Sequence, residues 1–287
     1  MKGVRGAAVL TVFFLTVLLS GCVQEGLIKQ EFSTQVEKNT EDFSYKVEVY
    51  PTHVKPGETV KIRFIFEPKK DINDMMVRFF DTCIFSPDYY GKKISLKKGT
   101  PKTLTVSFIA GETSLPKTCR LGFEFSYEAN YTKAQDIIVL SYDEYERRSK
   151  ENSLGEFVPE THEEESPLKI SLSFSEEQPF EQGDEISMTI QYSNVGKGTL
   201  EIKDVKIRVP ENLHAVSCDD YTIESDRSGR QVLSLSKKLK FYGSSTENSV
   251  CRFQIWGSQP VDIKLMEIEG KYIYELEDYI TVGVDVK

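Results

Sequence analysis

Residues 119–127 read CRLGFEFSY, and their alternation is the clearest structural signal in this chain. The odd-numbered residues, from Cys119 through Phe123 to Tyr127, are apolar, and the even-numbered residues are small, polar or charged. A period of two is typical of a β-strand with one buried face. Cys119 falls on the apolar face, so we expect its sulfur to point into a core.

The same alternation recurs outward from this strand in both directions. Further strands are predicted at 60–66, 103–109, 186–192 and 279–284, separated by turn signals such as Pro56-Gly57 and Gly183-Asp184. A short helix is predicted at 142–151. Many short strands at this spacing predict an all-β chain built from β-sandwiches.

Two pairs of segments indicate an internal repeat. IAGETSLPKTCRLGF (109–123) matches FYGSSTENSVCRFQI (241–255), and VKPGETVKIRFIFE (54–67) matches FEQGDEISMTIQYS (180–193). The period is too long for a solenoid, so we interpret it as two copies of one domain, with chance similarity as the alternative. The predicted domains are 43–143 and 166–287, joined by an acidic linker at 144–165.

The repeat also predicts how the cysteines pair. Without Cys22, four cysteines remain, and an even number in an exported chain suggests disulfides. The repeat selects Cys83–Cys119 and Cys218–Cys251. A zinc site is the alternative, but no two cysteines have CxxC spacing.

The stretch from Gln182-Gly183-Asp184 to Ser193-Asn194-Val195-Gly196 resembles the immunoglobulin-like, CARDB-like modules found in tandem on archaeal and bacterial surface proteins. The resemblance implies two tandem immunoglobulin-like sandwiches. The first copy departs from the pattern, since Glu67-Pro68-Lys69-Lys70 replaces the Asn-x-Gly. The sole tryptophan, Trp256, follows the second cysteine of its pair, which disfavours an antibody-type domain.

The first 22 residues predict an exported, membrane-anchored protein. Lys2 and Arg5 precede an uncharged stretch, Gly6 to Gly21, that has the features of a secretory signal. Leu19-Ser20-Gly21-Cys22 resembles the lipobox of secreted lipoproteins, which implies a signal peptide at 1–21 and a lipid on Cys22. Residues 22–42 then form a lipidated tether at the cell surface or in a periplasm-like space. An uncleaved anchor helix is the alternative.

Charge restricts the partners. The 287 residues carry a formal charge of −9, which argues against a nucleic-acid partner. Residues 43–143 are slightly basic, and their lysines are predicted to contact the membrane surface, which attracts such clusters. A solvated turn or a protected edge strand is the alternative. The predicted contact residues are Lys92, Lys93, Lys97, Lys98 and Lys102.

The sequence contains no recognisable catalytic motif. Gly-x-Ser-x-Gly, HExxH and GxxxxGK[ST] are all absent. We therefore expect no enzymatic activity, no cofactor and no metal, with calcium at Asp219-Asp220 as a weaker alternative. His214 precedes Cys218 without further partners and is interpreted as a surface histidine.

Loop tyrosines beside the predicted bridges are the candidate ligand contacts. Tyr89, Tyr90 and Tyr221 could bind a sugar or a protein partner, with packing on their own domain as the alternative. Asn130-Tyr131-Thr132 is a glycosylation sequon.

These features predict a non-catalytic surface module for binding, adhesion or envelope organisation. Its partners would be membrane lipid through Cys22 and an unknown extracellular protein or glycan. The alternatives are a solute- or glycan-binding lipoprotein serving a transporter or degrading system, and an accessory subunit of an envelope complex.

Overall fold

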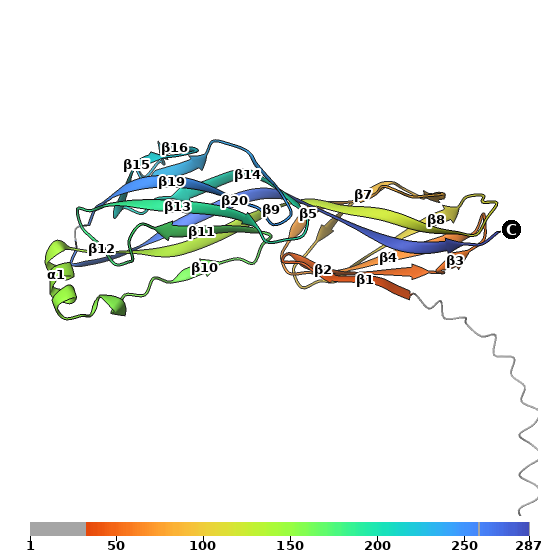
Figure 1. Cartoon of the computed structure of the whole chain (residues 1–287), viewed down its shortest axis with the longest axis horizontal. Coiled ribbons are helices and arrows are strands. Elements are labelled where there is room, and N and C mark those ends of the chain that lie inside the picture. Colours follow the sequence, from red (N-terminus) through yellow and green to blue (C-terminus); the bar gives the residue numbers. More distant parts are fainter. Residues whose placement is uncertain (1–32, 258, 287) are drawn as a thin grey trace, which may run out of the picture. The chain divides into compact units, whose positions relative to one another are not determined.

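The computed structural model describes residues 33–257 and 259–286. Within these residues the strands form three sheets, and one short α-helix, α1(Tyr142–Lys150), follows the long strand β9(Lys117–Leu140) (Figure 1). The all-β prediction is confirmed, and each predicted strand lies within an observed one.

Two of the sheets are outer layers. The first has the order β1(Ser33–Asn39), β2(Phe43–Tyr50), β4(Thr59–Pro68), β8(Lys102–Ala110) and β6(Phe85–Pro87). The second has the order β11(Leu168–Phe174), β13(Glu185–Asn194), β19(Thr246–Ile255) and β15(Leu213–Cys218). Each packs through its apolar face on part of a third sheet.

The third sheet is shared by both sandwiches. Its order is β16(Tyr221–Ser225), β17(Gln231–Leu235), β14(Thr199–Arg208), β20(Val261–Val284), β9(Lys117–Leu140), β5(Ile72–Phe79) and β7(Gly91–Leu96). Short strands β3(His53–Val54), β10(Thr161–Glu163), β12(Phe180–Glu181) and β18(Leu239–Tyr242) attach to β20, β9, β9 and β14.

Strands β9 and β20 join the two sandwiches. Each is 24 residues long, and they pair antiparallel along their whole length, from Lys117 opposite Val284 to Leu140 opposite Val261 (Figure 1). The end of each strand therefore adds to the sheet of the other sandwich. The predicted boundaries at 143 and 166 do not follow these strands, because 131–140 lies in the second sandwich and 276–284 in the first. The described residues form one compact unit.

The strand order confirms an internal repeat, but it does not align the two cysteine segments, 109–123 and 241–255, with each other. The order β2-β4-β8-β6 corresponds to β11-β13-β19-β15, and β7-β5-β9 corresponds to β17-β14-β20. The Gly57 and Gly183 segments are thus equivalent, since each leads into the matching strand, β4 or β13. The two Cys-Arg pairs of the repeat, Cys119-Arg120 and Cys251-Arg252 (the CR motifs), are not equivalent. Cys119 lies in β9, whereas Cys251 lies in β19, the counterpart of β8.

Both predicted disulfides are present. Cys83–Cys119 connects the loop before β6, in an outer sheet, to β9 in the shared sheet. Cys218–Cys251 connects register partners on neighbouring strands of one sheet. Cys119 and Cys251 are fully buried, as the alternation predicted. The bridges indicate an oxidising, extracytoplasmic location.

The acidic linker is partly structured. The predicted helix is confirmed as α1(Tyr142–Lys150), with Ser141 capping its first turn through a hydrogen bond from the Glu144 amide. A 3₁₀ turn, Leu154–Glu156, and β10 follow, and β10 pairs with β9. The linker is therefore tied to the second sandwich by backbone hydrogen bonds.

The expected tether, 22–42, is wrong for its second half. Residues 33–39 form β1, which pairs with β2 at the edge of the first sheet. The sequence hid this strand because its side chains are mostly exposed or half-buried, and its backbone hydrogen bonds hold it in place. Residues 1–21 and Cys22 lie outside the described residues.

The polypeptide crosses between the sandwiches around a buried carboxylate. Asp42 is fully buried, and its Oδ2 accepts hydrogen bonds from the hydroxyls of Tyr127 (2.7 Å) and Tyr272 (2.8 Å). Its Oδ1 lies 2.8 Å from Lys70 Nζ. Burial, and then the Asp42 charge, raise the pKa of Tyr127 well above its usual range. Both tyrosines are therefore hydrogen-bond donors at any physiological pH.

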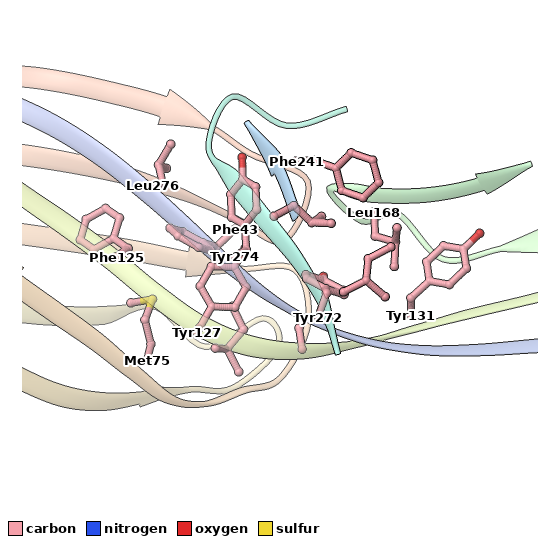
Figure 2. Packing of buried hydrophobic residues seen from close by; sticks show 14 of the residues in the cluster. Phe43, Met75, Phe125, Tyr127, Tyr131, Leu168, Phe241, Tyr272, Tyr274 and Leu276 are labelled. Atoms are coloured by element: carbon pink, nitrogen blue, oxygen red, sulfur yellow. The ribbon is translucent and has the colours of Figure 1, made fainter. Parts of the chain in front are cut away.

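A second group of polar contacts lies farther along the paired strands β9 and β20, here called the β9–β20 ladder. Figure 2 shows Tyr127, Tyr131, Tyr272 and Tyr274 along the crossing of β9 and β20. The Tyr131 hydroxyl donates to Glu163 Oε1 at 2.7 Å, and Lys133 Nζ donates to the Ile170 carbonyl at 2.8 Å. Burial raises the pKa of Tyr131. These bonds attach β10 and β11 to the shared sheet.

Candidate functional site

Two of the three predicted ligand-contact tyrosines are packing residues. Tyr221 is buried, and its hydroxyl is hydrogen-bonded to that of Tyr192. Tyr89 is half-buried against Phe79, and its hydroxyl donates to the Thr105 carbonyl. Tyr90 alone is largely exposed. For Tyr221 and Tyr89, the alternative of packing on their own domain therefore holds, because each ring completes a core.

The five predicted membrane-contact lysines are all exposed. Lys92 and Lys93 lie on β7, an edge strand, with Lys92 over the ring of Tyr89. Lys97 and Lys98 lie in the turn after β7, and Lys102 opens β8 opposite Phe66. The register places Lys102 at the Asp42 end of the first sheet, whereas Ser33 lies opposite Val49 at its other end.

The sequon asparagine lines a hollow on the outer face of the shared sheet. Asn130 and Thr132 are exposed on one face of β9. The hollow has a volume of about 460 Å³, and its other polar lining residues are Asp204, Lys206, Glu269 and Lys271. The sequon is therefore accessible in the folded chain.

The lone tryptophan lies at a second hollow, which is the candidate site. Trp256 follows the end of β19, is 49% exposed, and stacks on the His214 ring, with 4.4 Å between ring centroids and 2° between planes. The adjoining hollow, here called the Trp256 hollow, has a volume of about 230 Å³. Its polar lining includes Glu211, Ser228, Arg230 and Gln231.

Hydrogen bonds hold the backbone on both sides of the Trp256 hollow in place. The Trp256 amide donates to the Asn212 carbonyl at 2.8 Å. The buried Asn212 amide nitrogen donates to the carbonyls of Ile137 and Asp262, at the end of the β9–β20 ladder. Gln231 exchanges two hydrogen bonds with the Ala215 backbone, which orients the strand beside His214. The Trp256 hollow is thus built on the ladder rather than on a free loop.

Arg230 brings a cationic hydrogen-bond donor to the Trp256 hollow. Its guanidinium lies 3.6 Å from a carboxylate oxygen of Asp226 and 3.6 Å from one of Glu267. Both distances are too long for hydrogen bonds, and the Arg230 Nε, which is the atom paired with Asp226, is buried without a hydrogen-bond partner among the described residues. Glu211 supplies an exposed acceptor on the same lining. Donors, an acceptor and a flat apolar ring therefore meet at one place.

Sequence reasoning missed this site. His214 was expected to be a plain surface residue, and Trp256 served only to disfavour an antibody-type domain. The two residues are 42 positions apart, and only the pairing of Leu213 with Ile255 brings them together. The one signal in the sequence was the position of Trp256, a large aromatic residue directly after the predicted alternation that ends at Ile255.

An acidic row occupies the outer face of the ladder in the first sandwich. Glu124 lies directly opposite Glu277, and Glu275 lies opposite Ser126. Burial, partly offset by Arg78 and reinforced by Glu275 and Glu277, raises the pKa of Glu124. Because the pKa is higher in the folded chain than in the unfolded chain, ionisation of Glu124 opposes folding. This penalty is absent below the unfolded pKa and complete above the folded pKa.

We expect Glu124→Gln to raise the free energy of unfolding by about 0.5–1 kcal/mol at pH 7, the size of a like-charge cross-strand pair. At pH 3 the gain should vanish, because both states are protonated there. Urea denaturation at the two pH values measures it. Glu128→Gln, an exposed residue opposite Ile273 on the same strand, is the control. A Glu124→Gln variant less stable than the parent at pH 7 would contradict this account.

No metal centre is evident among the described residues, where no three His, Cys, Asp or Glu side chains converge on one point. Asp220, the second residue of the alternative calcium site, is held by Lys237 at 2.8 Å and by Ser249 at 2.9 Å. Hydrogen bonds from Lys237 and Ser249 lower the pKa of this carboxyl. Within the part of the chain that the structure describes, no helix is long and apolar enough to cross a membrane.

Comparison with known proteins gives only distant structural matches. No family model matches the chain, and no curated protein matches it. Activated alpha-2-macroglobulin of Escherichia coli matches 85% of this chain at 9% identity, with a TM-score of 0.23. The C-terminal globular domain of the Pyrococcus abyssi oligosaccharyltransferase matches 82% at 9% identity, with a TM-score of 0.26. The type II cohesin dyad of Acetivibrio cellulolyticus matches 75% at 9% identity, with a TM-score of 0.22.

The matched regions cover 33%, 46% and 86% of those three chains. The chain thus spans less than half the length of the first two proteins. At such low TM-scores the matches assign no function.

Proposed function

We propose that this chain is a lipid-anchored extracytoplasmic lipoprotein whose double sandwich presents a binding surface and carries out no catalysis. The lipid on Cys22 fixes the protein to the membrane, and two acyl chains make that attachment stable. The disulfides support the extracytoplasmic location. The partner is a protein or glycan of the cell envelope or its surroundings.

The observation that carries the proposal is the placement of the chain entry and the Trp256 hollow at opposite ends of β20. Gln35, near the start of β1, exchanges two hydrogen bonds with the Thr281 backbone. Asn212, which holds Trp256, bonds to the Asp262 carbonyl at the other end of the same strand. An anchor attached before β1 therefore leaves the Trp256 hollow at the free end.

The same strand register favours the Trp256 hollow, rather than the lysine cluster, as the contact surface. Lys97, Lys98 and Lys102 lie near the Asp42 end of the first sheet, away from Ser33. The anchor thus gives these lysines no preferred access to lipid headgroups. We keep them as solvated residues that protect an edge of the sheet.

We expect the intact protein, extracted from membranes, to lack residues 1–21 and to carry a mass increment equal to a diacylglycerol-type lipid. Non-reducing mass spectrometry with and without thiol blocking measures this, and neither bridge should react with the blocking reagent. Cys22→Ser is the matched control, which removes the sulfur but leaves the hydrophobic segment unchanged. A full-length mass without lipid would overturn the anchor.

A solute- or glycan-binding role is the second candidate function. It is favoured by the Trp256 hollow, since binding sites for small ligands are concave and combine apolar surface with a few polar groups. Such a lipoprotein would deliver its ligand to a transporter or a degrading enzyme.

A further inference from the structure

We propose that the Trp256 hollow binds the ring of a neutral pyranose sugar. The inference deepens the presenting role and rests on the proposed function, because the Trp256 hollow is the contact end of the anchored chain. Its basis is the combination of a half-exposed tryptophan with the polar side chains of Arg230 and Glu211 beside it.

The indole provides the platform. Trp256 is the chain's only tryptophan, and it is 49% exposed, although burying an aromatic side chain is strongly favourable. His214 covers one face of the ring at 4.4 Å, and backbone hydrogen bonds hold the residue in place. A ligand with a flat apolar face would bury the remaining surface at little conformational cost.

The size of the Trp256 hollow restricts the ligand to a single small ring. A volume of about 230 Å³ is below the range of pockets that enclose drug-sized molecules. Gly229, at φ +84°, opens one wall, since no atom lies within 4 Å of where its Cβ would be. Longer chains of sugars could therefore continue past Gly229 into solvent.

The charges around the Trp256 hollow favour a neutral ligand with hydroxyl groups. An anion would meet Glu211, Asp226 and Glu267, and a cation would meet Arg230. Sugar hydroxyls both donate and accept, so one ring can take hydrogen bonds from Arg230 and donate to Glu211. The opposite face of a pyranose carries C–H groups that pack on an indole.

Because Trp256 is the only tryptophan, its fluorescence reports on the Trp256 hollow alone. The full-length chain, in a detergent without a sugar headgroup, is titrated with methyl glucoside, galactoside, mannoside and N-acetylglucosaminide. We expect a saturable emission change for at least one, with a dissociation constant of about 1–10 mM, the range for a ligand of this size. Sorbitol, an open-chain polyol, is the ligand control, and glucuronate and glucosamine represent the charged classes.

Variants then locate the binding. Arg230→Gln should weaken the best glycoside at least about threefold, and Trp256→Ala at least about tenfold when followed by calorimetry. Tyr242→Ala, which removes a 73% exposed aromatic side chain elsewhere in the same sandwich, should leave affinity unchanged. Circular dichroism checks that each variant is folded.

Three results would overturn the inference. The first is no saturable change with any neutral glycoside up to about 100 mM, a concentration above the dissociation constant expected for a specific site. The second is an equal effect from sorbitol, and the third is binding of glucuronate or glucosamine alone. The lipid mass tests the anchor separately. If the protein carries the lipid but binds no glycoside, only the sugar inference is wrong. If it binds a glycoside but carries no lipid, only the proposed anchor is wrong.

Discussion

Replacing Asp42 with alanine is expected to lower the free energy of unfolding by about 3–5 kcal/mol, the usual cost of breaking a buried ion pair from one side. The change leaves Lys70, only 11% exposed, without its 2.8 Å partner. It also removes the acceptor of the Tyr127 and Tyr272 hydroxyls, and each unpaired buried donor adds to the cost. Urea denaturation followed by circular dichroism measures the loss.

Asp278 offers a matched control for Asp42. It accepts a hydrogen bond from the Tyr45 hydroxyl at 2.8 Å and pairs with Lys38 at 2.6 Å, but its side chain is 14% exposed and that of Lys38 is 40% exposed. Water can replace these partners, so Asp278→Ala should cost about 1–2 kcal/mol. Asp42→Asn, which keeps an acceptor for the tyrosines but removes the charge, should fall between the two. Equal losses for Asp42→Ala and Asp278→Ala would show that burial of Asp42 has no special role.

Local periodicity made most of the fold predictable. Alternation fixes which residues of a strand face a core, and it identified 119–127, 60–66 and 186–192 without knowledge of their partners. The Gly57 and Gly183 turns gave the correct correspondence between β4 and β13. The disulfide pairing also followed from the repeat, although the CR motifs occupy different positions in the two halves.

The features that sequence reasoning missed depend on long-range pairing. Nothing near Tyr131 or Leu276 shows that the two strands continue into each other's sandwich, because the local pattern of a strand does not identify its partner strand. Strand β1 has a single apolar residue, Val36, and Asp42 resembles any acidic residue in a tether. The Trp256 hollow needs β15 beside β19. In each case the deciding partner is far away in the chain.

Removing both disulfides is expected to leave the chain close to unfolded at 37 °C. The bridges close loops with sequence separations of 36 and 33 residues, so loop entropy predicts about 3–4 kcal/mol for each. Their sum is comparable with the total stability of about 5–15 kcal/mol that single domains possess. Urea denaturation with and without a reductant, with thiol counting to confirm reduction, measures the loss. Reduced and oxidised protein within about 1 kcal/mol of each other would contradict it.

Comparing the bridges one at a time separates chain entropy from local structure. Loop-closure entropy depends only weakly on length, so the Cys83→Ala/Cys119→Ala and Cys218→Ala/Cys251→Ala variants should lose nearly equal stability. Their contacts differ, because Cys83–Cys119 joins two sheets, whereas Cys218–Cys251 joins strands that the ladder already pairs. If native contacts dominated, the first variant would lose far more than the second. Nearly equal losses would therefore assign the stabilisation to the unfolded chain, and only a marked inequality would assign it to the link between the sheets.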